Sequence, residues 1–106
     1  MTVVTPGSTQ VLEQRVAEAA QLLRLLSNER RLLVLCHLLE HGEMSVGTLA
    51  EAVGLAQPAL SQHLAMMRSQ GLVATRRAAQ TIHYRVADPK AERVVQVLHE
   101  LFCPPT

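Results

Sequence analysis

Aromatic residues are almost absent from this sequence of 106 residues, since they make up 2% of it and tryptophan does not occur. Hydrophobic residues nevertheless make up 48%. The core must therefore be built from leucine, valine, alanine and methionine. A β-sandwich would draw mainly on β-branched and aromatic residues, so this composition favours packed helices. The length corresponds to one small domain, for which oligomerisation is a common way to enlarge the core.

Long hydrophobic runs are missing as well. Stretches such as Leu32–Leu35 are far too short to span a bilayer, so we predict no contact with a membrane. The segment Met1–Gln10 has neither charge nor an apolar block, and we expect no signal peptide there. The expected location is the cytoplasm. Only two cysteines occur, and in a reducing compartment such a pair more often supplies thiols, ligands or a redox switch than a structural disulfide.

Acidic residues are absent from one third of the chain. None occurs between Glu51 and Asp88, although the chain has nine in total. The net charge of the whole chain is only +1. Since the window contains arginines and no carboxylate, it nevertheless forms a distinctly basic segment. Such a distribution is typical of a protein that presents one face to a polyanion, and chance clustering on a solvated surface is the alternative. The basic side chains of the window are Arg68, Arg76, Arg77, Arg85, His63 and His83.

Apolar periodicity, together with capping residues, predicts five helices and one hairpin. The helices are expected over 9–26, 28–42, 45–54, 57–71 and 88–103. Two runs with strand character, 72–77 and 81–86, flank a link made of Ala78, Ala79 and Gln80. We therefore expect a flexible lead-in over 1–8, one domain over 9–103 and a short tail over 104–106.

The third and fourth predicted helices are short, and the tight turn Gly54-Leu55-Ala56 separates them. A pair of this kind followed by a hairpin is a winged helix-turn-helix. The predicted fold is mainly α with a small β-hairpin, in the order of four helices, two strands and a last helix.

The second helix of a helix-turn-helix enters the major groove of double-stranded DNA, and residues near its N-terminus meet base edges. Leu60 and Leu64 are four residues apart and should face the core, which turns their neighbours outward. Glutamine can pair with adenine, serine can donate or accept, and an alanine methyl can touch a thymine methyl. Arginines are suited to phosphate or minor-groove contacts, and the alternative for each single residue is ordinary polar surface. The predicted DNA-binding residues are Gln57, Ala59, Ser61, Gln62, His63, Arg68, Arg76, Arg77, Gln80 and Arg85.

Four motifs resemble the ArsR/SmtB family of bacterial winged helix-turn-helix repressors. They are Asn28-Glu29-Arg30-Arg31-Leu32, Ser45-Val46-Gly47-Thr48-Leu49, Ala59-Leu60-Ser61-Gln62-His63-Leu64 and Gly71-Leu72-Val73. The resemblance covers roughly residues 10–103. It implies a transcriptional repressor, not an enzyme, that forms a homodimer through its first and last helices. It also implies an inverted-repeat operator and release from DNA when an inducer arrives.

Members of this family often sense metals, but neither metal site that the resemblance implies is intact here. A thiolate site in the second helix requires two closely spaced cysteines, and Cys36 stands alone. A zinc site in the last helix requires a histidine two residues after Asp88 and a second ligand three residues after His99, and both are missing. We therefore predict no metal and no cofactor. Surface or capping roles are expected for His37, His41, His83 and His99.

Cys36 and Cys103 resemble the cysteine pair of the HlyU, BigR and SqrR branch of the family, which is associated with sensing reactive sulfur species or oxidants. This resemblance implies a thiol switch in which the reduced protein binds DNA. A disulfide or polysulfide bridge between the second and last helices would then weaken binding. Because Cys36 lies among leucines and Cys103 lies near an exposed end, we expect Cys103 to attack first.

Several alternatives stay open on the sequence alone. The two cysteines could be inert, or they could join a histidine in an arsenite or zinc sensor. A winged fold can also serve as a protein-interaction module without binding DNA. A thiol oxidoreductase is disfavoured, because the chain has neither a Cys-x-x-Cys motif nor a βαβ pattern.

Overall fold

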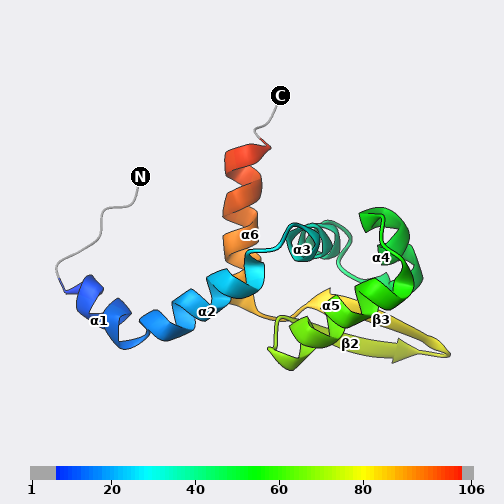
Figure 1. The fold of residues 1–106 in the computed structure, drawn as a ribbon, viewed down its shortest axis with the longest axis horizontal. Helices are drawn as coiled ribbons and strands as arrows, with labels where there is room; N and C mark the ends of the chain where they lie inside the picture. The colour runs from blue at the N-terminus through cyan, green and yellow to red at the C-terminus, as the bar shows by residue number, and fades with distance from the viewer. Residues whose placement is uncertain (1–6, 104–106) are drawn as a thin grey trace.

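The protein is a mainly helical winged helix-turn-helix, as the sequence predicts (Figure 1). The computed structural model describes residues 7–103. Along the chain, its elements are α1 (Ser8–Gln14), α2 (Val16–Leu26), α3 (Glu29–His41), β1 (Met44–Ser45), α4 (Val46–Val53), α5 (Gln57–Ser69), β2 (Val73–Ala78), β3 (Thr81–Val86) and α6 (Pro89–Phe102).

Side-chain caps fix the starts of three helices, at the positions expected from sequence. The side chain of Asn28 accepts a hydrogen bond from the Arg31 amide at 3.1 Å at the start of α3. Ser45 caps α4 and Asp88 caps α6 in the same way. Each cap satisfies a backbone N–H group that has no partner inside its helix. The sequence therefore sets the boundaries of these helices locally.

The core contains only leucine, valine, alanine and methionine, as the composition predicts. It lies between α3, α4, α5 and the inner side of the sheet, and the first half of α6 closes it. Leu60 and Leu64 of α5 have no exposed surface. Within residues 7–103, no polar or charged residue is buried. The buried set is Leu26, Val34, Leu35, Leu38, Met44, Leu49, Ala50, Val53, Leu60, Leu64, Met67, Leu72, Val73, Ala91 and Val95.

The N-terminal helix is not continuous, and the prediction of a single helix over 9–26 is wrong. The backbone leaves the helical region at Arg15, with φ −122° and ψ 15°, and its amide donates to Leu12 three residues earlier. The residues of α1 whose burial is described are exposed, so tertiary packing does not hold α1 in line with α2. Helix α1 begins at Ser8, inside the predicted lead-in. Residues 1–6 and the predicted tail 104–106 lie outside the described residues.

The wing is a three-stranded antiparallel sheet, whereas the sequence predicts two strands. Strand β1 adds to the hairpin in the order β1-β3-β2, with Met44 opposite Tyr84. A strand of two residues is too short to show an alternating pattern, which is why sequence reasoning missed it. Ala78 belongs to β2 and pairs with Thr81, so the link is shorter than predicted. Ala79 takes the left-handed φ of +56° that this tight turn requires.

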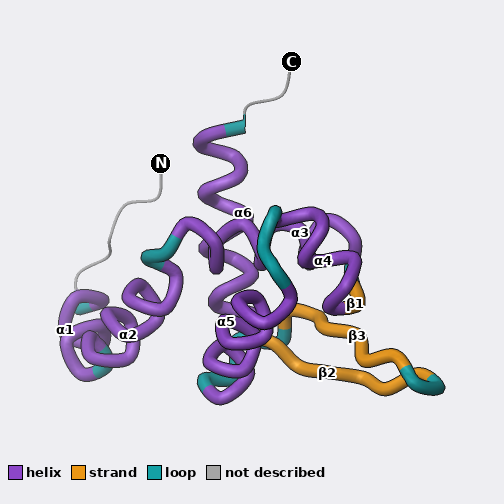
Figure 2. The backbone as a smooth tube through the Cα atoms, turned by 45° about the vertical axis from the view of Figure 1, so that its right-hand side comes forward, coloured by secondary structure: helices purple, strands orange, loops and turns teal. Residues whose placement is uncertain are grey.

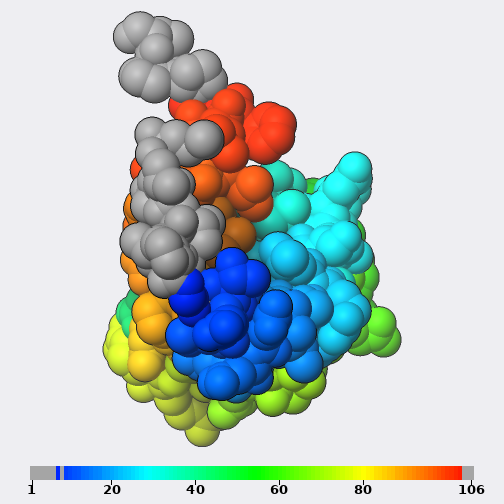
Figure 3. Space-filling view, turned by 90° about the vertical axis from the view of Figure 1, so that its left-hand side faces the viewer, coloured from blue at the N-terminus to red at the C-terminus, as the bar shows by residue number. Residues whose placement is uncertain are grey.

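Helices α1 and α2 form an arm on one side of the body, and α6 extends away from it, while the hairpin reaches out on the opposite side from the arm (Figures 1 and 2). Figure 3 looks onto the face that carries the arm. Arg31 fastens the arm to α3, because its Nε donates to the Leu25 carbonyl at 2.7 Å. Across residues 7–103, no helix has the length and apolar character needed to cross a membrane.

Candidate nucleic-acid interface

The helix-turn-helix consists of α4, a three-residue turn and α5. Gly54 ends α4 in a left-handed conformation with φ 69°, which a glycine adopts without steric cost. Arg30 of α3 secures the same helix end, since its Nη1 donates to the Val53 carbonyl at 2.9 Å. Sequence reasoning recorded Arg30 only as part of a motif and missed this role. The hydrogen bond joins residues 23 positions apart and leaves no local signal in the sequence.

Helix α5 presents one polar face to solvent. Leu60, Leu64 and Met67 anchor its opposite face completely in the core. The structure thereby exposes the predicted base-reading residues, with His63 half-buried at the edge of the face. The helix lies beside the hairpin, on the part of the molecule farthest from the end of α6 (Figure 1). The exposed members are Gln57, Ala59, Ser61 and Gln62 near the N-terminus of α5 and Arg68 in its last turn.

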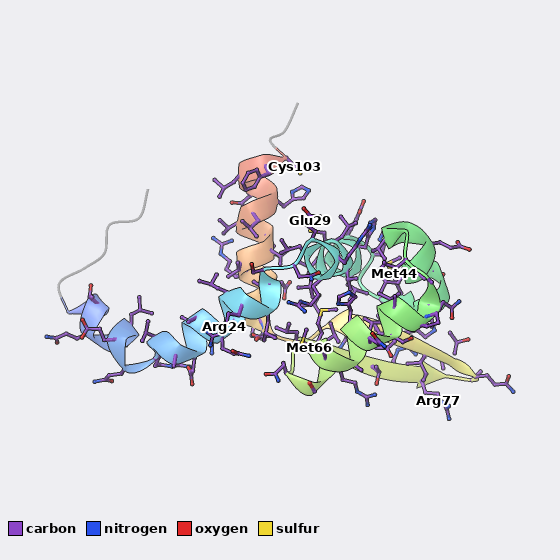
Figure 4. All side chains as sticks on the ribbon, in the orientation of Figure 1. Arg24, Glu29, Met44, Met66, Arg77 and Cys103 are labelled. Carbon is purple, nitrogen blue, oxygen red and sulfur yellow. The ribbon has the colours of Figure 1, made fainter. Side chains whose placement is uncertain are left out.

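The arginines of the hairpin lie on both of its faces. Arg76 is opposite His83 and Arg85 is opposite Ala74, so Arg76 and Arg85 share one face. Arg77 is opposite Ile82 and projects from the other face, near the outer end of the hairpin (Figure 4). The structure thus places the predicted phosphate contacts along the hairpin but separates them into two sets.

Arg76 forms an ion pair that the sequence does not predict. Its Nη2 donates to Oε1 of Glu43 at 2.7 Å, and its Nε lies 3.1 and 3.2 Å from the two carboxylate oxygens. The hydrogen bonds from Arg76 hold the pKa of Glu43 below its usual value, and the positive charges of Arg76, His83 and Arg85 lower it further. An acidic residue next to the window that lacks carboxylates therefore neutralises one of its arginines. The pairing depends on the strand order β1-β3-β2, which sequence periodicity does not reveal.

The remaining arginines of the interface keep their charge unpaired. Among residues 7–103, the salt bridges are Arg15–Glu18 and Arg76–Glu43. Arg68, Arg77 and Arg85 are exposed and take part in neither. The segment from α5 to β3 thus offers three unpaired arginines and the polar face of α5 to a polyanion.

The two cysteines lie away from this interface. Cys36 of α3 is half-buried, and it lines a pocket together with Glu40 of the same helix and Gln96 and His99 of α6. Burial raises the pKa of the Cys36 thiol, and the nearby Cys103 adds to this shift. Cys103 is exposed at the end of α6, where its amide donates to the His99 carbonyl at 2.8 Å. Cys103 and Arg77 lie at opposite ends of the molecule in Figure 4.

A cluster of possible metal ligands lies at the end of α3. His37, Glu40 and His41 bring one ligand atom each to within 4.8 Å of one another. Sequence reasoning expected surface or capping roles for the two histidines. His41 is exposed, and its Nδ1 lies 3.0 Å from the His37 carbonyl, as in a helix cap.

Large apolar side chains are exposed on the arm and on the end of α6. Leu23 of α2 is 60% exposed, and Phe102 of α6 is 78% exposed. A small domain rarely leaves so many large apolar groups in water unless a partner covers them. The exposed apolar residues of these elements are Val11, Leu12, Val16, Leu23, Leu101 and Phe102.

Comparisons with known proteins agree with this geometry. A family profile described as "Bacterial regulatory protein, arsR family" matches residues 28–75. The transcriptional activator HlyU of Vibrio cholerae is 45% identical over 98 residues, which are 92% of this chain and 90% of HlyU. The structure of reduced HlyU from Vibrio cholerae has a TM-score of 0.82 at 46% identity and covers 89% of this chain and 98% of that one. The repressor BigR from Xylella fastidiosa has a TM-score of 0.84 at 42% identity, with 92% and 98% covered.

Proposed function

This chain belongs to the ArsR family of bacterial transcriptional regulators. We propose that it is a homodimeric repressor and that the redox state of Cys36 and Cys103 controls its affinity for operator DNA. Regulators of this family bind DNA. The repressor BigR is among the similar proteins, which supports repression as the mode of action. We expect the protein to act in the cytoplasm, where bacterial DNA is found.

The observation that carries the DNA-binding proposal is the polar face of α5 next to unpaired arginines. Helix α5 is held rigidly, because its three buried side chains fix its rotation about its own axis. Ser61 and Gln62 then project toward the position of base edges in a major groove. Arg68, Arg77 and Arg85 supply charge for the phosphates on either side. Gln80, exposed in the hairpin turn, completes the proposed set of DNA contacts.

The proposed homodimer forms through the arm and α6. Both elements extend from the body (Figure 1), and both carry exposed apolar side chains. Covering these faces with the same faces of a second chain would give an isologous interface, as in most two-fold dimers. Two copies of α5 related by a two-fold axis would read an inverted repeat.

The proposed switch begins at Cys103, the more accessible thiol. Its thiolate attacks the outer sulfur of a low-molecular-weight persulfide, RSSH, and forms a Cys103 persulfide while RS⁻ leaves. The Cys36 thiolate then attacks the Cys103 sulfur, a disulfide forms and HS⁻ leaves. Overall, two protein thiols and RSSH give the disulfide, RSH and H₂S. Cys36 lines the pocket between α3 and α6, and the nearby Cys103 contributes to the raised pKa of Cys36, which supports this pairing.

A disulfide between α3 and α6 would act on DNA binding through the dimer. Helix α3 carries Arg30, which secures the end of α4, and α6 carries part of the proposed interface. A Cys36–Cys103 disulfide would therefore couple the distance between the two chains of the dimer to the position of α5 in each chain. A bias of about 1.4 kcal/mol between two dimer shapes is enough for a tenfold change in affinity.

The experiment measures operator binding and protein mass in parallel, for the reduced protein and after treatment with persulfide. We expect a mass loss of two hydrogens per bridged chain together with at least tenfold weaker binding. Cys36→Ser and Cys103→Ser should each abolish the change in DNA affinity while keeping the affinity of the reduced protein. A bridged protein with unchanged affinity would refute the switch. Release of DNA by arsenite instead would favour the metalloid sensor that the sequence left open.

A further inference from the structure

We propose that His37, Glu40 and His41 form a binding site for a first-row divalent cation of the Zn²⁺ type at the end of α3. The three residues share one face of the helix, because they stand at positions i, i+3 and i+4. Two histidines four residues apart on one helix face are an arrangement that binds zinc. Glu40 adds a carboxylate between them.

The orientation of His41 prepares one nitrogen for a metal. Its Nδ1 lies 3.0 Å from the His37 carbonyl, and donation of the Nδ1 proton to that oxygen leaves a lone pair on Nε2. Metal-bound histidines usually donate their second ring nitrogen to a carbonyl or carboxylate in this manner. The two imidazole rings are nearly parallel, at 16°, with their centroids 6.1 Å apart.

His37 carries a polar atom without a partner. Its Nδ1 is buried and has no hydrogen-bond partner among the described residues. A buried polar nitrogen of this kind is destabilising unless it is engaged. Coordination of a cation by Nδ1 itself would engage this nitrogen and leave the proton of the neutral ring on Nε2.

The position in the helix favours positive charge. His41 is the last residue of α3, and Gly42 ends the helix. The carbonyl groups at the C-terminal end of a helix carry a partial negative charge, which attracts cations. Neither ion pair found within residues 7–103 involves Glu40, so its carboxylate is not held in a salt bridge there.

The geometry fits a small borderline cation better than Ca²⁺ or Mg²⁺. Two imidazoles and one carboxylate are ligands that Zn²⁺ prefers, at about 2.0–2.2 Å each, whereas hard cations prefer oxygen alone. The ligand atoms already lie within 4.8 Å of one another. Since Glu40 is exposed, rotation of its side chain can bring the carboxylate closer to the two histidines. A water molecule would complete the coordination sphere.

The test uses the full-length reduced protein without an affinity tag, titrated with Zn²⁺ in a calorimeter. We expect one ion per chain, and affinity lower by about tenfold or more in His41→Ala. His41 is exposed, so this variant should fold normally, and its unfolding midpoint without metal is compared with that of the parent protein. The control is His63→Ala, which removes a histidine of α5 outside the cluster and should leave zinc affinity unchanged.

A second arm separates this site from the cysteines. The variant with both Cys36→Ser and Cys103→Ser should keep its zinc affinity, and its Co²⁺ complex should lack a sulfur-to-cobalt charge-transfer band. The proposal is overturned if His41→Ala binds zinc as tightly as the parent protein. It is equally overturned if zinc binding is lost with the two cysteines, or if the parent protein binds no zinc.

Discussion

Replacing Glu43 with glutamine should strengthen DNA binding, because Glu43 neutralises an arginine of the wing. The carboxylate accepts hydrogen bonds from Nη2 and Nε of Arg76 at 2.7–3.2 Å. Glutamine keeps the size of the side chain but removes its charge. Arg76 then becomes a free cation on the hairpin face that already carries Arg85.

The magnitude follows from the release of counterions by phosphate contacts. Each new contact steepens the slope of log K against log salt by about 0.9. Between 50 and 200 mM salt, a fourfold change, this amounts to roughly 3.5-fold in affinity for each hairpin that gains a contact. If two hairpins of a dimer bind, the slope steepens by about 1.8 and the ratio is roughly 12-fold. Glu43→Gln should therefore show its largest gain at low salt.

The assay measures equilibrium binding to an operator duplex and to random duplex DNA over this salt range. The matched control is Arg77→Gln, which should flatten the slope without disturbing the Glu43–Arg76 pair. The double variant with Glu43→Gln and Arg76→Gln should have nearly the slope of the parent protein. If Glu43→Gln leaves the slope unchanged while Arg76→Gln flattens it as much as Arg77→Gln does, then Arg76 binds phosphate while still paired, and the reasoning fails.

Two further predictions concern stability and thiol reactivity. Replacing Arg30 with methionine should lower the free energy of unfolding in urea by about 1 kcal/mol, because the Val53 carbonyl loses a charged donor. Amide hydrogen exchange should speed up around the helix-turn-helix turn in the same variant, and equal protection in the two proteins would speak against the role of Arg30. Iodoacetamide at neutral pH should alkylate Cys103 before Cys36, since Cys103 is exposed whereas burial raises the pKa of Cys36. Peptide mass spectrometry over a time course measures the order, and faster labelling of Cys36 would contradict it.

The arm and the wing show where sequence reasoning stopped. The apolar spacing from 9 to 26 predicts one helix, but the described residues of α1 are exposed and the chain bends at Arg15. Strand β1 can be recognised only from its pairing with β3, because two residues are too few to show the alternating apolar pattern of a strand. Pairing with a distant strand creates β1, and the absence of packing against α1 accompanies the break at Arg15; local spacing contains neither.

The sequence by itself determined the capped starts of α3, α4 and α6 and the exposed face of α5, on which most of the predicted base-reading residues lie. These features come from interactions between residues three or four positions apart, so the order of side chains along the chain encodes them directly. Only the tertiary structure decided that Glu43 neutralises Arg76, that Arg30 secures α4, and that Cys36 faces α6. Those contacts join residues far apart in the chain, and their geometry exists only once the core has fixed the helices and strands relative to one another.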